Sequence, residues 1–135
     1  MAEFKSDRFL INTTRKGLKE FLSQPSNLKL ILPEDRIENW KEEGNSCSFK
    51  IKGLAEIRLK LEDSDEGEVI YASASDKPFP FKLVVRLGED QEGGSEINAF
   101  FDADVNSFMG AMIKTPLTNF LNALGDAIKK RFAKA

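Results

Sequence analysis

Hydrophobic residues recur at three- and four-residue steps along the carboxyl-terminal part of the chain, over residues 107 to 133. This spacing places them on one face of an α-helix. We therefore predict a long amphipathic helix whose apolar stripe packs against a broad partner. The stripe consists of Met109, Ile113, Leu117, Leu121, Leu124 and Ile128, widened by Met112 and Phe120.

A proline, Pro116, lies inside this helical pattern. It removes the hydrogen bond to the carbonyl of Met112 and costs on the order of 3 kcal/mol, so we expect a kink. The kink has two interpretations. It either only bends the helix over a curved sheet or, together with Gly110, opens the mouth of a pocket that the loops near Pro78 and Gly53 would gate.

Between residues 35 and 105, hydrophobic and polar residues alternate, and turn residues interrupt the alternation. This pattern is typical of an antiparallel meander. The predicted strands span residues 36–42, 46–52, 55–61, 68–75, 78–87 and 96–105. Their expected inward residues include Cys47, Phe49, Ile51, Ile57, Leu59, Leu61, Phe79, Phe81, Leu83, Val85, Leu87, Ile97, Ala99, Phe101, Ala103 and Val105. In residues 68–75 either face could be the inner one, and Phe100 falls on a polar face.

The amino-terminal part of the chain predicts one strand and two short helices. Residues 3 to 12 alternate, as a strand does. Thr13 or Thr14 then caps a helix that the following proline ends. Residues 26–32 predict a second helix with Ser26 as its N-cap. The expected inward residues are Phe9, Ile11, Leu18, Phe21, Leu22, Leu28, Ile31 and Leu32.

The order of these elements predicts an α+β fold in which a seven-stranded curved antiparallel sheet wraps around the long C-terminal helix. Consecutive strands joined by tight turns should be neighbours in the sheet. At 135 residues, the chain fits a single domain over residues 1–135 with a real hydrophobic core. A helix held by a curved sheet leaves room between them for a ligand.

Composition narrows the possible functions. The net charge of −2 gives no broad basic surface, so we expect no binding to nucleic acid. No apolar run approaches the roughly 20 residues that span a bilayer, and the first residues lack the apolar run of a signal peptide. We therefore expect no stable membrane insertion and a cytoplasmic location. Cys47 is the only cysteine and histidine is absent, so we expect no disulfide, metal, cofactor or catalytic residue set.

Several segments resemble a known superfamily: QPSNLKLILP after the first strand, PFPF at the start of the sixth, and DADVNSFMGAMIKTPLTNFLNALGDAI at the end. With the order of elements, they resemble the helix-grip fold of the START-related SRPBCC superfamily. That superfamily includes birch-pollen-allergen-like proteins, polyketide cyclases and lipid-transfer domains, and the CSFKIKG-type strand is similar to that of small uncharacterised bacterial members. The resemblance covers essentially the whole chain. It implies an internal apolar pocket, in a fold that hosts binding proteins and enzymes alike.

We predict that this pocket binds or carries a hydrophobic small molecule such as a lipid or a polyketide, since methionine and aromatic side chains suit an adaptable apolar ligand. Tyr71 or Ser73 would supply a polar contact. The expected lining residues are Leu28, Leu32, Phe49, Ile57, Leu59, Tyr71, Phe79, Phe81, Leu83, Phe101, Met109, Met112, Ile113, Pro116 and Phe120.

Two alternatives stay open. One is a polyketide cyclase or dehydratase-like enzyme in which Tyr71 donates hydrogen bonds to the substrate. The other is a cochaperone- or maturation-type interaction protein that binds a protein client or a second copy of itself. Trp40 and Phe100 at the surface would fit the second alternative, although Trp40 could equally be a pocket lid.

Other charged residues fit surface roles. Asp102 and Asp104 share a strand face, but both alternate against apolar positions, which favours solvated carboxylates over an acid–base pair. The acidic runs at 62–68 and 89–92 lack the ordered ligand spacing of a calcium loop, so we interpret them as turns.

Overall fold

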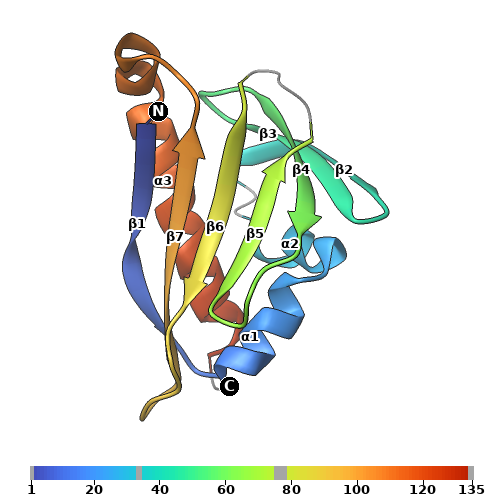
Figure 1. Cartoon of the computed structure of the whole chain (residues 1–135), viewed down its shortest axis with the longest axis vertical. Helices are drawn as coiled ribbons and strands as arrows, with labels where there is room; N and C mark the ends of the chain where they lie inside the picture. Colours follow the sequence, from blue (N-terminus) through green and yellow to red (C-terminus); the bar gives the residue numbers. More distant parts are fainter. Residues whose placement is uncertain (1, 33–34, 75–78, 134–135) are drawn as a thin grey trace.

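The computed structural model describes residues 2–32, 35–74 and 79–133, and it contains the predicted elements in the predicted order (Figure 1). Their bounds are β1 (Ala2–Ile11), α1 (Arg15–Leu22), α2 (Pro25–Ile31), β2 (Ile37–Glu43), β3 (Ser46–Ile51), β4 (Glu56–Glu62), β5 (Glu68–Ser73), β6 (Phe81–Leu87), β7 (Ser95–Ala103) and α3 (Ser107–Arg131). The predicted α+β helix-grip fold is confirmed.

All seven strands of the described chain form one antiparallel sheet in the order β1-β7-β6-β5-β4-β3-β2. Strands β2 to β7 are sequential neighbours because short turns join them, while α1 and α2 carry the chain from β1 at one edge to β2 at the other. Figure 1 shows α3 running behind the sheet, with α1 and α2 at the side near β2 and β5. One face of the sheet thus lies on α3, and among the residues that the structure describes no element covers the other face.

The inner face of the sheet carries the predicted apolar residues. Those of β3, β6 and β7 from Cys47 to Ala103 are buried as expected, and Leu61 of β4 is half-buried. The open question for β5 is settled, because Val69 and Tyr71 are buried and Ile70 lies on the outer face.

The apolar stripe of α3 begins differently from the prediction. Met109 and Met112 are 40% and 61% exposed, so their assignment to the inward stripe was wrong. Gly110 is buried in their place, next to Ala2 of β1, where an added Cβ would lie at an ordinary contact distance of 3.5 Å from the Cβ of Ala2. From Ile113 to Ile128 the predicted stripe is confirmed, and α3 continues through Pro116. No helix in the described ranges combines the length and apolarity that crossing a membrane requires.

The N-cap of α1 is one of the two predicted residues, whereas that of α2 differs from the prediction. The hydroxyl of Thr14 accepts a hydrogen bond from the amide of Gly17 at 3.0 Å, so Thr14 is the N-cap of α1. The prediction of Ser26 as the N-cap of α2 was wrong, because α2 begins at Pro25. Proline suits the first helical position, where its missing N–H is not needed.

Phe100, which falls on the polar side of its strand, lies on the outer face of the sheet. The guanidinium carbon of Arg86 is 4.4 Å from the centre of its ring, an arrangement that a cation–π attraction stabilises. Phe100 stands opposite Val84, and Val84 stands opposite Ile70. These three half-buried residues form an apolar row, which we call the outer row, across β7, β6 and β5.

Candidate ligand-binding site

Helix α3 lies close to one side of the sheet and stands away from the other. A Cβ added at Gly125 would overlap the ring of Phe9, so only glycine permits the close contact of α3 with β1. α3 also lies against β7, whereas its backbone is further from β4, β5 and β6. Space for an internal ligand is therefore expected between α3 and strands β3 to β6.

Large side chains fill the middle of this space. The ring of Trp40 stacks on Phe49 with 6.0 Å between centroids, and Phe49 stacks on Phe120 of α3 at 5.9 Å. Phe49, Leu59 and Phe120 are 0% exposed. Since a void that admits water would leave accessible surface on its walls, these side chains border no such void. Trp40, whose role the sequence left open, covers this stack at the edge of the sheet.

Most of the predicted lining residues are part of this packed interior. The buried ones are Leu28, Leu32, Phe49, Ile57, Leu59, Tyr71, Phe79, Phe81, Leu83, Phe101, Ile113 and Phe120, while Pro116 is half-buried. They come from seven different elements, from the C-cap of α2 and from the segment before β6, and they gather on the side of the sheet that faces α3. Met109 and Met112 lie instead on the exposed surface of α3.

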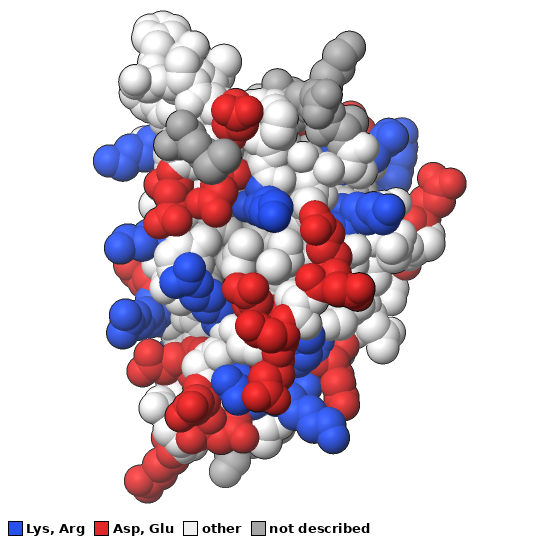
Figure 2. Space-filling view, in the orientation of Figure 1, with Lys and Arg blue, Asp and Glu red and all other residues white. Residues whose placement is uncertain are grey.

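The start of α3 carries a cluster of exposed apolar side chains. Phe108, Met109 and Met112 are 75%, 40% and 61% exposed. Figure 2 shows an uncharged projection where Figure 1 places the beginning of α3. We call these three residues the apolar end. The N-cap Asn106 accepts a hydrogen bond from the amide of Met109 at 2.8 Å, which holds the first turn in place.

An aromatic trio lies at the same end of the molecule. Phe81 stacks on Phe101 with 4.9 Å between ring centroids, and Phe79 meets both rings edge-on at 6.3 and 6.5 Å. Phe81 stands opposite Ala103, the last residue of β7, from which the chain passes to α3. The trio is therefore buried at the end of β6 and β7 from which the chain passes to α3.

The turn at Gly53, one of the two loops predicted to gate the pocket, lies against α3, and its gating role stays a prediction. A Cβ added to Gly53, in the turn between β3 and β4, would lie 3.3 Å from the Cβ of Pro116, so this turn lies against the middle of α3. Gly53 has a φ of +83°, which glycine adopts without strain. The other predicted gate residue, Pro78, lies outside the described residues.

The polar residues considered for the pocket are already engaged. The hydroxyl of Tyr71 donates a hydrogen bond to the carbonyl of Leu22 at 2.9 Å, and the hydroxyl of Ser73 accepts one from the amide of Phe81 at 3.1 Å. Burial raises the pKa of Tyr71, and the neighbouring Cys47 adds to the effect. Burial also raises the pKa of the Cys47 thiol to about 12, so the thiol stays neutral and unreactive.

Sequence reasoning missed the role of Lys19. Its ammonium leaves α1 and donates hydrogen bonds to the carbonyls of Asp65 at 3.0 Å and Glu68 at 2.6 Å, and to the hydroxyl of Ser64. The acidic run 62–68 is thus a turn whose carbonyls hold a lysine. The sequence around Lys19 does not indicate this contact, because Ser64 of the turn lies 45 residues further along the chain.

Comparison with known proteins adds to this description. A scan against models of protein families and a search of curated proteins found no match to the sequence. Solved structures do match: norcoclaurine synthase from Thalictrum flavum is 14% identical, with a TM-score of 0.74 over 99% of this chain and 94% of that one.

Two further solved structures have the same architecture. A START superfamily protein from Mycobacterium smegmatis is 10% identical, with a TM-score of 0.71 over 96% of each chain. The Aha1 dimer from Colwellia psychrerythraea is 18% identical, with a TM-score of 0.60 over 96% of this chain and 97% of that one. Likeness at these identities shows the fold, a START-like helix grip, and function has to be argued from the site.

Proposed function

We propose that the protein binds an apolar small molecule, such as a lipid or a polyketide-like metabolite, at the apolar end of the helix grip. The observation that carries this proposal is the exposure of Phe108, Met109 and Met112 on neighbouring turns of one helix. Large apolar side chains that gather on a surface are typical of binding sites.

The neighbouring residues suit a ligand of this kind. Methionine side chains adapt to different apolar shapes. The rings of Phe79, Phe81 and Phe101 lie at the end of β6 and β7 from which the chain passes to α3, and because they are buried a ligand would reach them only after side chains move. The middle of the grip is filled by the stacked rings of Phe49 and Phe120 and has no room for a ligand beside them. We therefore expect the ligand to lie at the apolar end. It would enter further, between α3 and the Gly53 turn, only when the side chains of Phe49 and Phe120 move.

Binding of an apolar fluorescent probe tests the proposal. We expect 1-N-phenylnaphthylamine to bind the native protein and to be displaced by fatty acids or by flat aromatic polyketides. Replacing both Phe108 and Met112 by serine should weaken probe binding at least ten-fold, because losing about 60 Å² of apolar contact at roughly 25 cal/mol per Å² costs about 1.5 kcal/mol.

The matched control is Leu30→Ser on α2. Leu30 is 54% exposed and lies on another helix, so its replacement should leave probe binding unchanged. No probe uptake by the native protein, or an equal loss in the Leu30 variant, would contradict the proposal. Native mass spectrometry of freshly purified protein should show the mass of any ligand carried through purification.

An enzymatic role for Tyr71 requires its bond to Leu22 to open, because the hydroxyl already donates to that carbonyl. The cyclase alternative predicts that Tyr71→Phe abolishes turnover of a polyketide substrate and leaves probe binding intact. Probe binding that changes together with turnover would point to a structural role of this hydroxyl.

The outer row favours a protein partner as the second candidate function. Ile70, Val84 and Phe100 are half-buried on the sheet face that none of the described helices covers, and the name of one structural neighbour states a dimer. Sedimentation velocity at increasing concentration should then show a homodimer that Phe100→Glu converts to a monomer. A native monomer at all concentrations counts against this candidate.

A further inference from the structure

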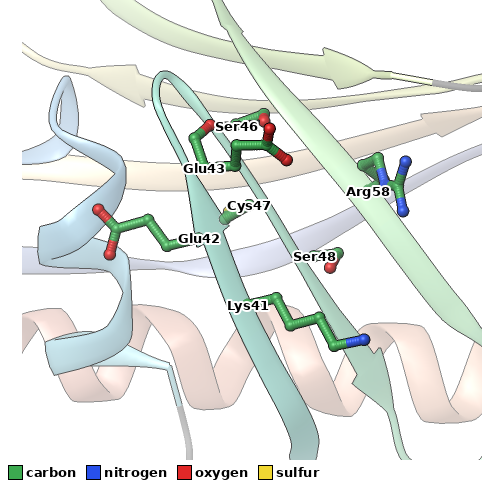
Figure 3. A pocket seen from close by; sticks show the side chains of 7 residues that line it. All are labelled: Lys41, Glu42, Glu43, Ser46, Cys47, Ser48 and Arg58. Carbon is green, nitrogen blue, oxygen red and sulfur yellow. Dashed lines mark hydrogen bonds between the residues drawn. The ribbon is translucent and has the colours of Figure 1, made fainter.

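A hollow of about 380 Å³ lies on the outer face of the sheet over β2, β3 and β4, on the side opposite α3 (Figure 3). It shares no residue with the apolar end. Its lining is polar, and it includes two cationic side chains, Lys41 and Arg58, together with the serines 46 and 48. The hollow is therefore a candidate site for a ligand of a different chemistry.

The two cations belong to one cross-strand row. Lys41 of β2 stands opposite Ser48 of β3, which in turn stands opposite Arg58 of β4. Adjacent strands are about 4.8 Å apart, so the backbone positions of Lys41 and Arg58 are roughly 10 Å apart. Figure 3 shows the two long side chains on either side of Ser48. That spacing accommodates one tetrahedral oxyanion between them.

A β-bulge places Lys41 in this row. The register of β2 shifts between Glu38 and Lys41, and Asn39 adopts a φ of +61°. Without the extra residue, Lys41 would stand opposite Cys47 and face the interior, and Trp40 would face outward. The bulge therefore turns the tryptophan into the core and the lysine toward the hollow.

The lining carries two cations, Lys41 and Arg58, and two carboxylates, and only the cations stand in the cross-strand row of Ser48. Within the described residues, neither Lys41 nor Arg58 forms an ion pair, whereas Glu38 pairs with Lys50 at 3.4 Å. Glu43 lies on the outer face opposite Ser46, and its negative charge would repel a bound anion. The carboxylate of Glu42 points away from the row, toward α2 (Figure 3).

We propose that this hollow binds the phosphate group of a small phosphorylated molecule. Arg58 donates paired hydrogen bonds from its planar guanidinium, and Lys41 donates from the opposite side. Ser48, which is only 5% exposed, lies on the floor and donates its hydroxyl proton to a third oxygen. This arrangement satisfies a tetrahedral oxyanion from three strands of a rigid sheet.

Titration of the ¹⁵N-labelled protein with inorganic phosphate and with phenyl phosphate, at constant ionic strength, tests this proposal. We expect saturable shifts of the amide signals of β2, β3 and β4. Tighter binding of phenyl phosphate would identify a phosphate ester as the ligand, whereas equal affinities would identify free phosphate. Shifts that do not saturate, or that spread equally over lysines elsewhere, would overturn the proposal.

Charge variants make the test specific. Lys41→Met and Arg58→Met should each weaken phosphate binding about ten-fold, because each removes a charge-assisted hydrogen bond. Lys5→Met, on the same face at the opposite edge of the sheet, is the control that should change nothing. Equal affinity of the Lys41, Arg58 and Lys5 variants would overturn the proposal.

A gain of affinity tests the same geometry without any loss of a contact. Glu43→Gln should tighten phosphate binding several-fold, because it removes the lining carboxylate that lies on the same face of the sheet as Lys41 and Arg58. Glu42→Gln removes the same charge one residue away, on the other face of β2, and should change the affinity much less. Identical effects of the two variants would show that only the overall charge matters, which contradicts a built site.

Discussion

Removing the hydroxyl of Tyr71 tests how much its hydrogen bond to α1 contributes to the stability of the fold. The hydroxyl donates to the carbonyl of Leu22 at 2.9 Å, and Tyr71 is 2% exposed. Leu22 is the last residue of α1, and the last carbonyls of a helix have no partner within the helix. Tyr71→Phe keeps the ring in the core and leaves this buried carbonyl without its donor.

The cost follows from the burial of the carbonyl. A buried polar group left without its partner costs about 1 to 3 kcal/mol, and we take about 1.5 kcal/mol. At about 2.1 cal/mol/K per residue, a chain of 135 residues has an unfolding entropy of about 0.28 kcal/mol/K. The melting temperature of Tyr71→Phe should therefore fall by about 5 °C.

Scanning calorimetry and urea unfolding measure this change. Ser46→Ala is the matched control, because it also removes one hydroxyl, which donates to the carbonyl of Glu43 at 2.8 Å on the exposed surface. Its free energy of unfolding should stay within about 0.5 kcal/mol of the native value. If Tyr71→Phe melts within about 1 °C of the native protein, the bond to Leu22 contributes nothing and the reasoning is refuted.

Three further predictions concern a turn, a thiol and a carboxylate. Gly94→Ala should cost more than about 3 kcal/mol in urea unfolding, because its φ is +129° and the new Cβ would overlap the carbonyl of Ile11; a near-native stability would contradict this contact. Cys47, whose pKa is raised, should not react with Ellman's reagent at pH 8 until guanidinium unfolds the protein; rapid reaction of the native thiol is the opposing result. The amide of Arg15 lowers the pKa of Asp90, so the stability that this carboxylate contributes is present above about pH 4 and is lost as the pH falls further; Asp90→Asn should flatten that part of a pH–stability curve.

The fold could be predicted from alternation and helical spacing because each strand has one wet and one dry face. The residues from Phe49 to Phe101 on the inner face follow directly from a period of two. The position of Trp40 could not be predicted in this way, because an extra residue in β2 changes which side chains face inward. A pattern of hydrophobic and polar letters carries no signal for such a bulge.

The candidate site was predictable only in part for a related reason. Hydrophobicity alone gives no weight to Gly125, although this glycine lets α3 approach Phe9 of β1. The hydrophobic pattern places Leu59 and Phe120 on facing surfaces, but it does not show whether a void separates their side chains. Packing depends on side-chain volumes from several elements together, which a single strand or helix does not contain.

The exposure of Phe108 and Met109 follows from where the sheet ends. Strand β7 ends at Ala103, and Gly110 is the first residue of α3 that is buried, next to Ala2. The turn of α3 before Gly110 therefore extends past the strand ends, as Figure 1 shows, and the sheet offers nothing for its apolar side chains to contact. A repeating apolar pattern that outlasts its internal partner needs a reason outside the core, since replacing Phe108 or Met112 by a polar residue would cost the fold little. Under the function proposed above, an apolar ligand that covers this turn supplies that reason, and the start of α3 is then part of the binding site.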